Sequence, residues 1–167
     1  MEIVRRIKCI LLPTEGVALI VESPDGKKIL TVIEMGKSKE WLGKIRGMET
    51  VPMETVRLWE RWWRRKALRR LVRDELGGID VEIEDKPRGI YQVVPRVHAF
   101  LYVGRAQTWC LPTSNGEVGG HKWIRPQDII SEKTPSRQGV EEMVDDYIAG
   151  RRNVYCSYCR PVASKRI

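Results

Sequence analysis

The sequence predicts an α/β sandwich, in which helices cover a mixed β-sheet. The first observation is the order of elements along the chain: strand, hairpin, loop, long helix, several strands and a last helix. A mixed sheet between helices satisfies this order, whereas an all-β barrel does not. The second observation is the length of 167 residues, which suits one ordinary domain with its own core. We expect this domain at residues 1–149 and a basic tail at 150–167.

Short apolar stretches between turn residues mark the expected strands. In chain order they cover residues 3–12, 16–22, 28–34, 81–84, 89–94, 97–104 and 121–124. The second and third stretches flank Ser-Pro-Asp-Gly, whose Asp25-Gly26 pair is typical of a hairpin turn. Residues 35–44, rich in Gly and Lys, and the polar residues 105–120 form the two long loops.

A long helical pattern occupies the middle of the chain. It covers about residues 54–76 and stops at Gly77-Gly78, because glycine is favoured just past the C-terminus of a helix. Two shorter helices are expected at residues 127–130 and 138–148. The sheet therefore has helices available for both of its faces.

The charge balance favours acidic partners. Lys and Arg number 30 against 22 Asp and Glu, which gives a formal net charge of +8. Such an excess suits nucleotides, nucleic acid or anionic surfaces, although it also serves solubility alone. Seven of the basic residues crowd positions 61–73, and five more lie in the tail.

Other features of the composition point to a reduced, cytoplasmic protein. No run of about 18 apolar residues is present, so we expect no membrane span, and the charged N-terminal residues make a poor signal peptide. The four cysteines are spread too widely for a disulfide framework. Cys156 and Cys159 have the spacing of a zinc knuckle, but zinc needs two further ligands. An ordinary thiol pair is the alternative.

Residues 41–78 are the most informative stretch. They contain Pro52-Met53-Glu54-Thr55 and, farther on, Arg70-Leu71-Val72-Arg73-Asp74-Glu75-Leu76-Gly77. This stretch resembles the Nudix box, written Gly-x5-Glu-x7-Arg-Glu-(apolar)-x-Glu-Glu-x-Gly-(apolar). The order of elements over about residues 8–148 is also similar to that of the Nudix fold. The resemblance implies an α/β/α sandwich in which a loop–helix–loop motif crosses a mixed sheet.

The stretch departs from the box at three places. Gly47, Glu54 and Gly77 match, but Met48 replaces the Gly that opens the box and Leu71 replaces a glutamate. Glu54 and Arg70 are also 16 positions apart where the box has 8. Eight more helical residues add about 12 Å and about 80° beyond two full turns. Either this insert, the eight residues Arg-Leu-Trp-Glu-Arg-Trp-Trp-Arg at positions 57–64, bulges out of the helix, or Glu54 loses Arg70 as its partner.

The resemblance implies a divalent-metal site for Mg²⁺ or Mn²⁺ beside a diphosphate. Positions 71, 74 and 75 share one helical face, so Asp74 and Glu75 are the expected ligands. Glu117, a loop glutamate, is expected as a further ligand or as the base that takes the proton of the attacking water. Because Leu71 offers no carboxylate, we expect weaker metal binding than in a full box. The alternative is that Asp74 and Glu75 are simply a solvated helix end.

Three hypotheses for the function follow. The first is a Nudix-type hydrolase of a nucleoside diphosphate linked to another group, with Glu75 and Glu117 catalytic and basic residues, including Arg46 and Arg70, on the phosphates. The second is a protein of the same fold without catalysis that binds a nucleotide or RNA through its arginine-rich insert. The third is a homodimer joined by the Trp-rich segment, because Trp59, Trp62 and Trp63 suit packing or a subunit contact more than base stacking.

Overall fold

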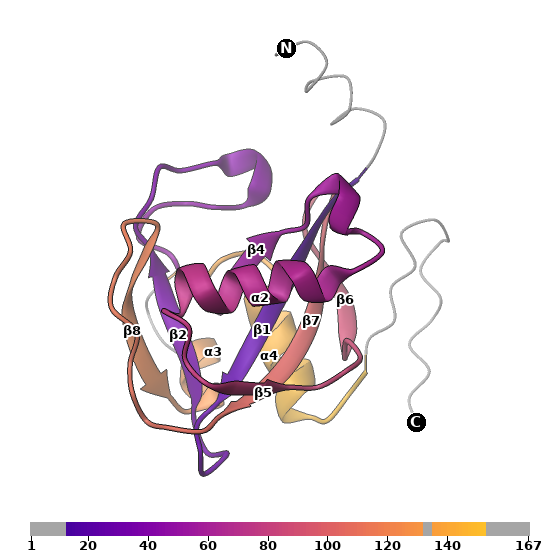
Figure 1. Cartoon of the computed structure of the whole chain (residues 1–167). Helices are drawn as coiled ribbons and strands as arrows, with labels where there is room; N and C mark the ends of the chain where they lie inside the picture. Colours follow the sequence, from indigo (N-terminus) through magenta and orange to yellow (C-terminus); the bar gives the residue numbers. More distant parts are fainter. Residues whose placement is uncertain (1–12, 132–134, 153–167) are drawn as a thin grey trace.

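A mixed eight-stranded sheet forms the centre of the molecule (Figure 1). The computed structural model describes residues 13–131 and 135–152. The strands are β1 (Thr14–Glu22), β2 (Ile29–Glu34), β3 (Glu49–Thr50), β4 (Met53–Thr55), β5 (Val81–Ile83), β6 (Gly89–Val94), β7 (Val97–Ala106) and β8 (Val118–Ile124). The helices are the short 3-10 turns η1 (Glu40–Leu42) and η2 (Leu58–Glu60) and the α-helices α2 (Arg64–Glu75), α3 (Pro126–Ser131) and α4 (Val140–Ile148).

The sheet is mixed because one central pair of strands is parallel. β1 pairs with β7 in parallel along its whole length, from Thr14 opposite Val97 to Glu22 opposite Arg105. The other pairs are antiparallel: β1 with β2 and β4, β2 with β3 and β8, and β7 with β5 and β6. The pairing of β1 with β2 is confined to Glu22 and Ile29, next to the expected hairpin turn.

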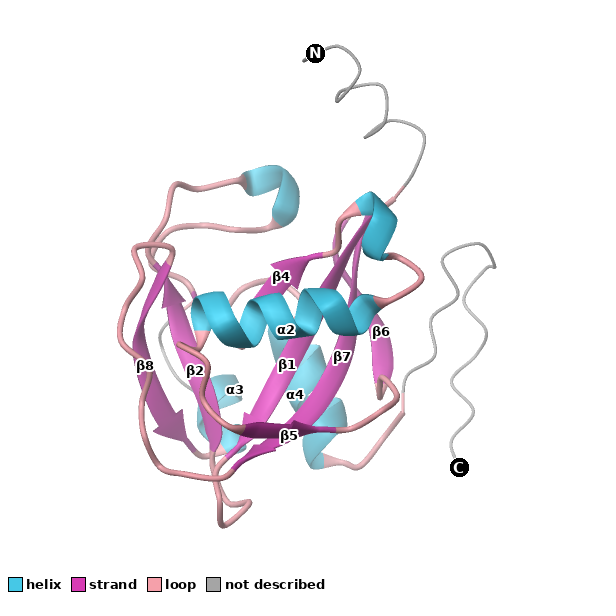
Figure 2. Cartoon of the chain, viewed as in Figure 1, coloured by secondary structure: helices cyan, strands magenta, loops and turns pink. Residues whose placement is uncertain are grey.

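The helices cover the two faces of the sheet, as the sequence predicts. α2 crosses one face, and α3 and α4 lie on the other (Figure 2). The alternation of side chains along β1 explains the arrangement: Val17 and Leu19 belong to the core beneath α2, whereas Ala18 and Ile20 belong to the core beneath α3 and α4. All four side chains are fully buried, which is typical of a central strand covered on both faces.

The expected helix over residues 54–76 is wrong in its first half. Residues 53–55 form β4, which pairs with β1 through Gly16 opposite Thr55. The helix α2 begins at Arg64, after Trp63 adopts a non-helical backbone with φ −135° and ψ 62°. Ladder hydrogen bonds to β1 fix residues 53–55 as strand, and tertiary pairing of this kind overrides a local helical pattern.

Most of the remaining elements follow the expectations where the structure describes them, but β3 and η1 were not expected, and β8 begins at Val118, inside the loop expected at residues 105–120. The hairpin strands are Thr14–Glu22 and Ile29–Glu34, and the last helix is Val140–Ile148. The expected first strand at residues 3–12 lies outside the described residues, as do Cys156 and Cys159 and most of the basic tail. Within the described ranges, no helix has the length and apolar character needed to cross a membrane.

Candidate functional site

A narrow cleft of about 30 Å³ opens between β1, β4, the η1 loop and the turn from β6 to β7. Apolar side chains of β6 and β7 form one wall. Its charged lining residues are Glu15, Lys44, Glu54 and Arg137. Two acidic and two basic side chains therefore line one cleft.

Glu75 reaches the wall of this cleft at β4. Its side chain is buried, and its Oε2 accepts a hydrogen bond from the backbone N–H of Met53 over 3.3 Å. The pKa of Glu75 is raised to about 8, chiefly by burial; Lys44 acts in the opposite direction, and the negative charges of Glu54 and Glu34 add to the rise. Glu75 is therefore mostly protonated at neutral pH.

Lys44 and Arg137 supply the positive charge of the site. Arg137 Nη1 donates to Glu34 Oε1 over 3.1 Å, and its Nη2 donates to the carbonyl of Leu42 over 2.7 Å. Lys44 Nζ lies 3.8 Å from Glu34 Oε2. Arg137 is only 5% exposed, and its Nε has no hydrogen-bond partner among the described residues. A buried donor without a partner is costly, so an acceptor from a ligand would stabilise it.

Arg70 ties the insert to the helix. Its Nη1 donates to Glu60 Oε1, its Nη2 donates to the carbonyl of Thr55, and its Nε lies 3.6 Å from Glu54 Oε2. Burial alone would raise the pKa of Glu60, but the backbone N–H of Arg57 and the guanidinium of Arg70 hold it below its ordinary value. The insert bulges out of the helix, and Glu54 and Arg70 remain neighbours.

The two other box positions on α2 point away from the cleft charges. Leu71 is fully buried in the core beneath the helix. Asp74 is exposed, and its Oδ1 accepts a hydrogen bond from Arg73 Nε over 2.6 Å. The Arg73 guanidinium lowers the pKa of Asp74, so this carboxylate is charged. In the part of the chain that the structure describes, no three His, Cys, Asp or Glu side chains are grouped so as to hold a metal ion.

The loop before β8 packs against the C-terminal end of α2. Asn115 Nδ2 donates to the carbonyl of Asp74, and Asn115 Oδ1 accepts from the backbone N–H of Glu117 over 2.9 Å. His121 Nε2 lies 2.9 Å from the carbonyl of Glu75, a distance at which its N–H donates to the free end of the helix. The loop that carries Glu117 is therefore held against the end of α2 at which Asp74 and Glu75 lie.

Glu117 itself lies against the end of β2. Its Oε2 is 2.8 Å from the place that a Cβ on residue 36 would occupy, so any other residue there would make the Glu117 carboxylate move. The backbone N–H groups of Met35 and Gly36 both donate to the Glu117 carbonyl. The side chain is exposed, and its role as metal ligand or base stays a prediction.

The oxygen donors at this end of α2 would fit one divalent cation, held together with a substrate, once Asp74 leaves Arg73 and turns toward Glu75. Mg²⁺ is usually bound by one or two carboxylates, several waters and substrate phosphates, rather than by a cage of protein ligands. Glu75 and Asp74 provide two carboxylates, and Glu34 and Glu54 raise the pKa of Glu75 by their charge. A cation would relieve this repulsion between like charges.

The predicted phosphate ligands differ in their surroundings. Arg46 is exposed on the η1 loop, where its backbone N–H donates to Ser38, and it does not line the cleft. Arg70 is buried among its own partners. Lys44 and Arg137, which do line it, were missed by sequence reasoning. Lys44 stands in a loop with several lysines, and Arg137 is 103 residues from Glu34, so no local spacing identifies either.

The fold of this chain is that of known Nudix proteins. It is similar to a NUDIX hydrolase from Nitrosomonas europaea, with a TM-score of 0.63 and 20% identity over 84% of this chain and 92% of that one. It is also similar to an ADP-ribose pyrophosphatase from Streptococcus suis, with a TM-score of 0.61 and 16% identity over 86% of this chain and 99% of that one.

A third similar structure contains a ligand. The NUDIX domain of Shewanella oneidensis NrtR, solved in complex with ADP ribose, has a TM-score of 0.61 and 11% identity over 86% of this chain and 91% of that one. No protein-family model and no curated protein sequence matches this chain. The chain therefore has the Nudix fold, an α/β/α sandwich with a mixed sheet, as the resemblance implied.

Proposed function

We propose that the chain is a Nudix-type hydrolase of a nucleoside diphosphate linked to another group, and that the diphosphate lies at the mouth of the cleft beside Glu75 while the rest of the substrate lies outside the cleft. The observation that carries this proposal is that buried Glu75 is hydrogen-bonded to Met53, which lines the same cleft as Lys44 and Arg137. Basic groups that are partly desolvated bind phosphate oxygens more strongly than basic groups in water. ADP-ribose is the first substrate to test, because two proteins of this fold carry it in their descriptions.

The residues of the cleft have separate roles in this proposal. Lys44 and Arg137 hold the diphosphate, and the free Nε–H of Arg137 donates to one of its oxygens. His121 and Asn115 hold the β8 loop against α2 and so keep Glu117 near the acidic end of the helix.

Mg²⁺ or Mn²⁺, held by Glu75 with Asp74 or Glu117, would neutralise phosphate charge and lower the pKa of a water molecule. Two side chains must change before the site can hold such an ion. Glu75 must lose the proton that burial and its acidic neighbours favour. Asp74 must leave its ion pair with Arg73, which is exposed and therefore weak.

A second candidate is nucleotide binding without turnover. It is favoured by Leu71, which is fully buried at the position of a box glutamate, and by the outward ion pair of Asp74 with Arg73. In this case the same cleft binds the nucleotide through Lys44 and Arg137. The acidic residues then serve to position these two bases.

One experiment separates the two candidates. ADP-ribose and related nucleoside diphosphate derivatives are incubated with the protein and Mg²⁺ or Mn²⁺, the products are separated by chromatography, and binding is measured by calorimetry. A hydrolase releases a nucleoside monophosphate, and Glu75→Gln lowers the rate at least 100-fold, while the exposed Glu82→Gln is a matched control. Binding without release supports the second candidate. Absence of both overturns the assignment of the cleft.

A further inference from the structure

The insert exposes three indole rings. Trp59, Trp62 and Trp63 are 67%, 85% and 63% exposed. They do not pack in the core, so the packing role predicted for them is wrong. Leaving large apolar side chains in water is unfavourable. A neighbouring group of such rings on one turn marks an interaction surface.

The turn that carries these rings is firmly held. Val56 is buried, Glu60 is 5% exposed and bonded to Arg70, and Arg61 donates to the carbonyl of Pro13. Arg64 donates to Glu15 through both Nε and Nη2, at 3.3 and 3.0 Å. The polar groups of the insert are therefore used for anchoring while the indoles face outward. A surface that is already ordered loses little entropy on binding a ligand.

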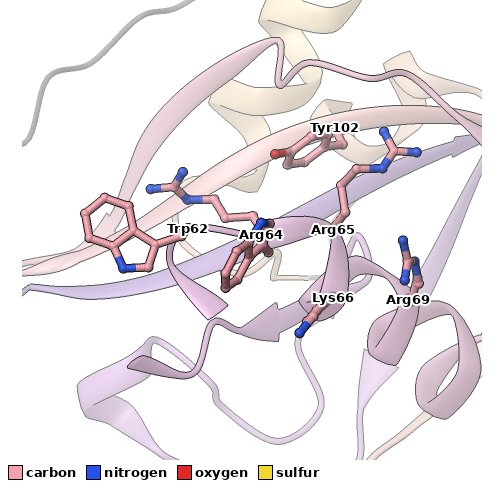
Figure 3. A pocket seen from close by; sticks show the side chains of 7 residues that line it. Trp62, Arg64, Arg65, Lys66, Arg69 and Tyr102 are labelled. Atoms are coloured by element: carbon pink, nitrogen blue, oxygen red, sulfur yellow. The ribbon is translucent and has the colours of Figure 1, made fainter. Parts of the chain in front are cut away.

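A groove of about 400 Å³ lies beside these rings (Figure 3). It is lined by Trp62, Trp63, Arg64, Arg65, Lys66, Arg69 and Tyr102. Lys66 Nζ lies 5.3 Å from the centre of the Trp63 ring. Neither Lys66 nor Arg69 forms an ion pair within the described ranges, and both are exposed. The groove thus joins aromatic rings to two cationic groups, Lys66 and Arg69, that have no acidic partner among the described residues.

The position of these cations on α2 favours an anionic partner. Arg64, Arg65 and Lys66 occupy the first turn of the helix, which has no acidic residue there. The N-terminal end of a helix carries partial positive charge, so cations at this end are unfavourable. Arg64 and Arg65 already pair with Glu15 and Asp85, so an anion lying across the turn would act mainly on Lys66. The helix end alone would indicate little, but here it coincides with the groove and the indoles.

We infer that this groove binds single-stranded nucleic acid, with bases stacked on Trp62 and Trp63 and phosphates on Lys66 and Arg69. Stacking on aromatic rings inside a basic groove is how proteins bind single strands without sequence preference. A second copy of this chain fits the surface less well, because two groups of like charges would face each other. A hollow of this size also suits a nucleotide unit better than the flat surface of a bilayer.

The groove and the nucleotide cleft are separate surfaces. The ion pair of Arg64 with Glu15 stands between them, since Arg64 lines the groove and Glu15 lines the cleft. The inference does not depend on hydrolysis, and Glu75→Gln should leave binding of the strand unchanged. Failure of the proposed function and failure of this inference are therefore distinguishable.

The test is the fluorescence anisotropy of a labelled RNA of ten mixed-sequence nucleotides, titrated with the full chain at several salt concentrations. Trp62→Ala and Trp63→Ala should each weaken binding about 10-fold, whereas Trp41→Ala, which removes an exposed indole from η1, should not. Arg69→Gln should lower the salt dependence by about 0.7 in the slope of log K against log salt. Lys27→Gln, in the β1–β2 turn, is the matched control.

An abasic strand of the same length separates stacking from charge. It keeps the phosphates, so it should bind about 10-fold more weakly than the RNA and should not respond to Trp62→Ala.

Equal affinities for the two strands, or RNA binding that the groove variants leave unchanged, would overturn the inference. So would vesicles of anionic lipid that bind through Trp62 while the RNA does not. Sedimentation could also show a dimer. If Trp62→Ala dissociates this dimer and RNA does not, the surface serves self-association and the inference is overturned. Thermal unfolding checks that each variant is folded.

Discussion

Arg70 and Glu54 remain neighbours across 16 positions of sequence, with Arg70 Nε 3.6 Å from Glu54 Oε2. In a continuous helix this separation would move them apart by eight additional residues, or about 12 Å. The insert instead leaves the helix, and it adds Glu60 as a second acidic partner of the same guanidinium. Arg70 thereby anchors both the strand that precedes the insert and the insert itself.

Removal of Arg70 should destabilise the whole domain. Arg70→Ala leaves Glu60 buried without its charged partner, and breaking a buried pair in this way costs about 3–5 kcal/mol. Urea denaturation measures the loss. The double variant Arg70→Met with Glu60→Gln should lose less than the sum of its two single variants, because it removes both charges together. Strictly additive effects would show that the pair is not coupled.

The stability of the protein should fall as the pH rises from about 4.5 to about 8. The pKa of Glu75 is about 8 in the folded chain against 4.5 for an ordinary glutamate, so in this range the folded state holds a proton that the unfolded state has lost. Each pH unit then costs up to about 1.4 kcal/mol of the free energy of unfolding. Glu75→Gln should remove this loss, and Glu82→Gln should retain it, in urea titrations at several pH values.

Restoring the missing box carboxylate should not restore a complete metal site. Leu71 is fully buried in the core beneath α2, and a charged glutamate there would lose its hydration without gaining a partner. Leu71→Glu should therefore lower the melting temperature sharply, whereas Leu71→Met should cost less than about 1.5 kcal/mol. A folded Leu71→Glu protein with higher affinity for Mn²⁺ would contradict this expectation.

Lys44 should contribute to nucleotide affinity. A hydrogen bond to a charged group contributes about 1.5–3 kcal/mol, so Lys44→Met should weaken binding of ADP-ribose about 10-fold or more. Its side chain is partly exposed, at 18%, and the fold should tolerate the change. Arg46→Met is the matched control, since Arg46 does not line the cleft. If calorimetry shows that Arg46→Met weakens ADP-ribose binding more than Lys44→Met does, the phosphate role predicted for Arg46 is favoured instead.

Local pattern was sufficient for most of the fold. The hairpin around Asp25-Gly26, the strands of the second half and the last helix follow from alternation and turn residues, which act over a few positions. The end of α2 before Gly77 was also predictable, because Gly77 has a positive φ of 61° that few other residues adopt. The resemblance of residues 41–78 to a known box supplied the remaining topology.

The start of α2 could not be predicted from local pattern. Residues 54–63 carry helix-forming side chains, but β4 is fixed by its pairing with β1, nearly 40 positions earlier in the chain. The same holds for the cleft, in which Arg137 meets Glu34 from 103 positions away. Partners at such distances are chosen by the folded arrangement of the sheet and not by spacing along the sequence.

The sequence by itself determined the fold class, the position of the stretch that resembles the Nudix box and the unusual concentration of tryptophan and arginine in its insert. Only the tertiary structure decided that Asp74 points outward while Glu75 is buried, that Lys44 and Arg137 line the cleft, and that the indoles are exposed. The physical reason is that burial depends on which elements cover a side chain. That covering comes from strands and loops distant in sequence, so neighbouring carboxylates on one helix can have opposite environments.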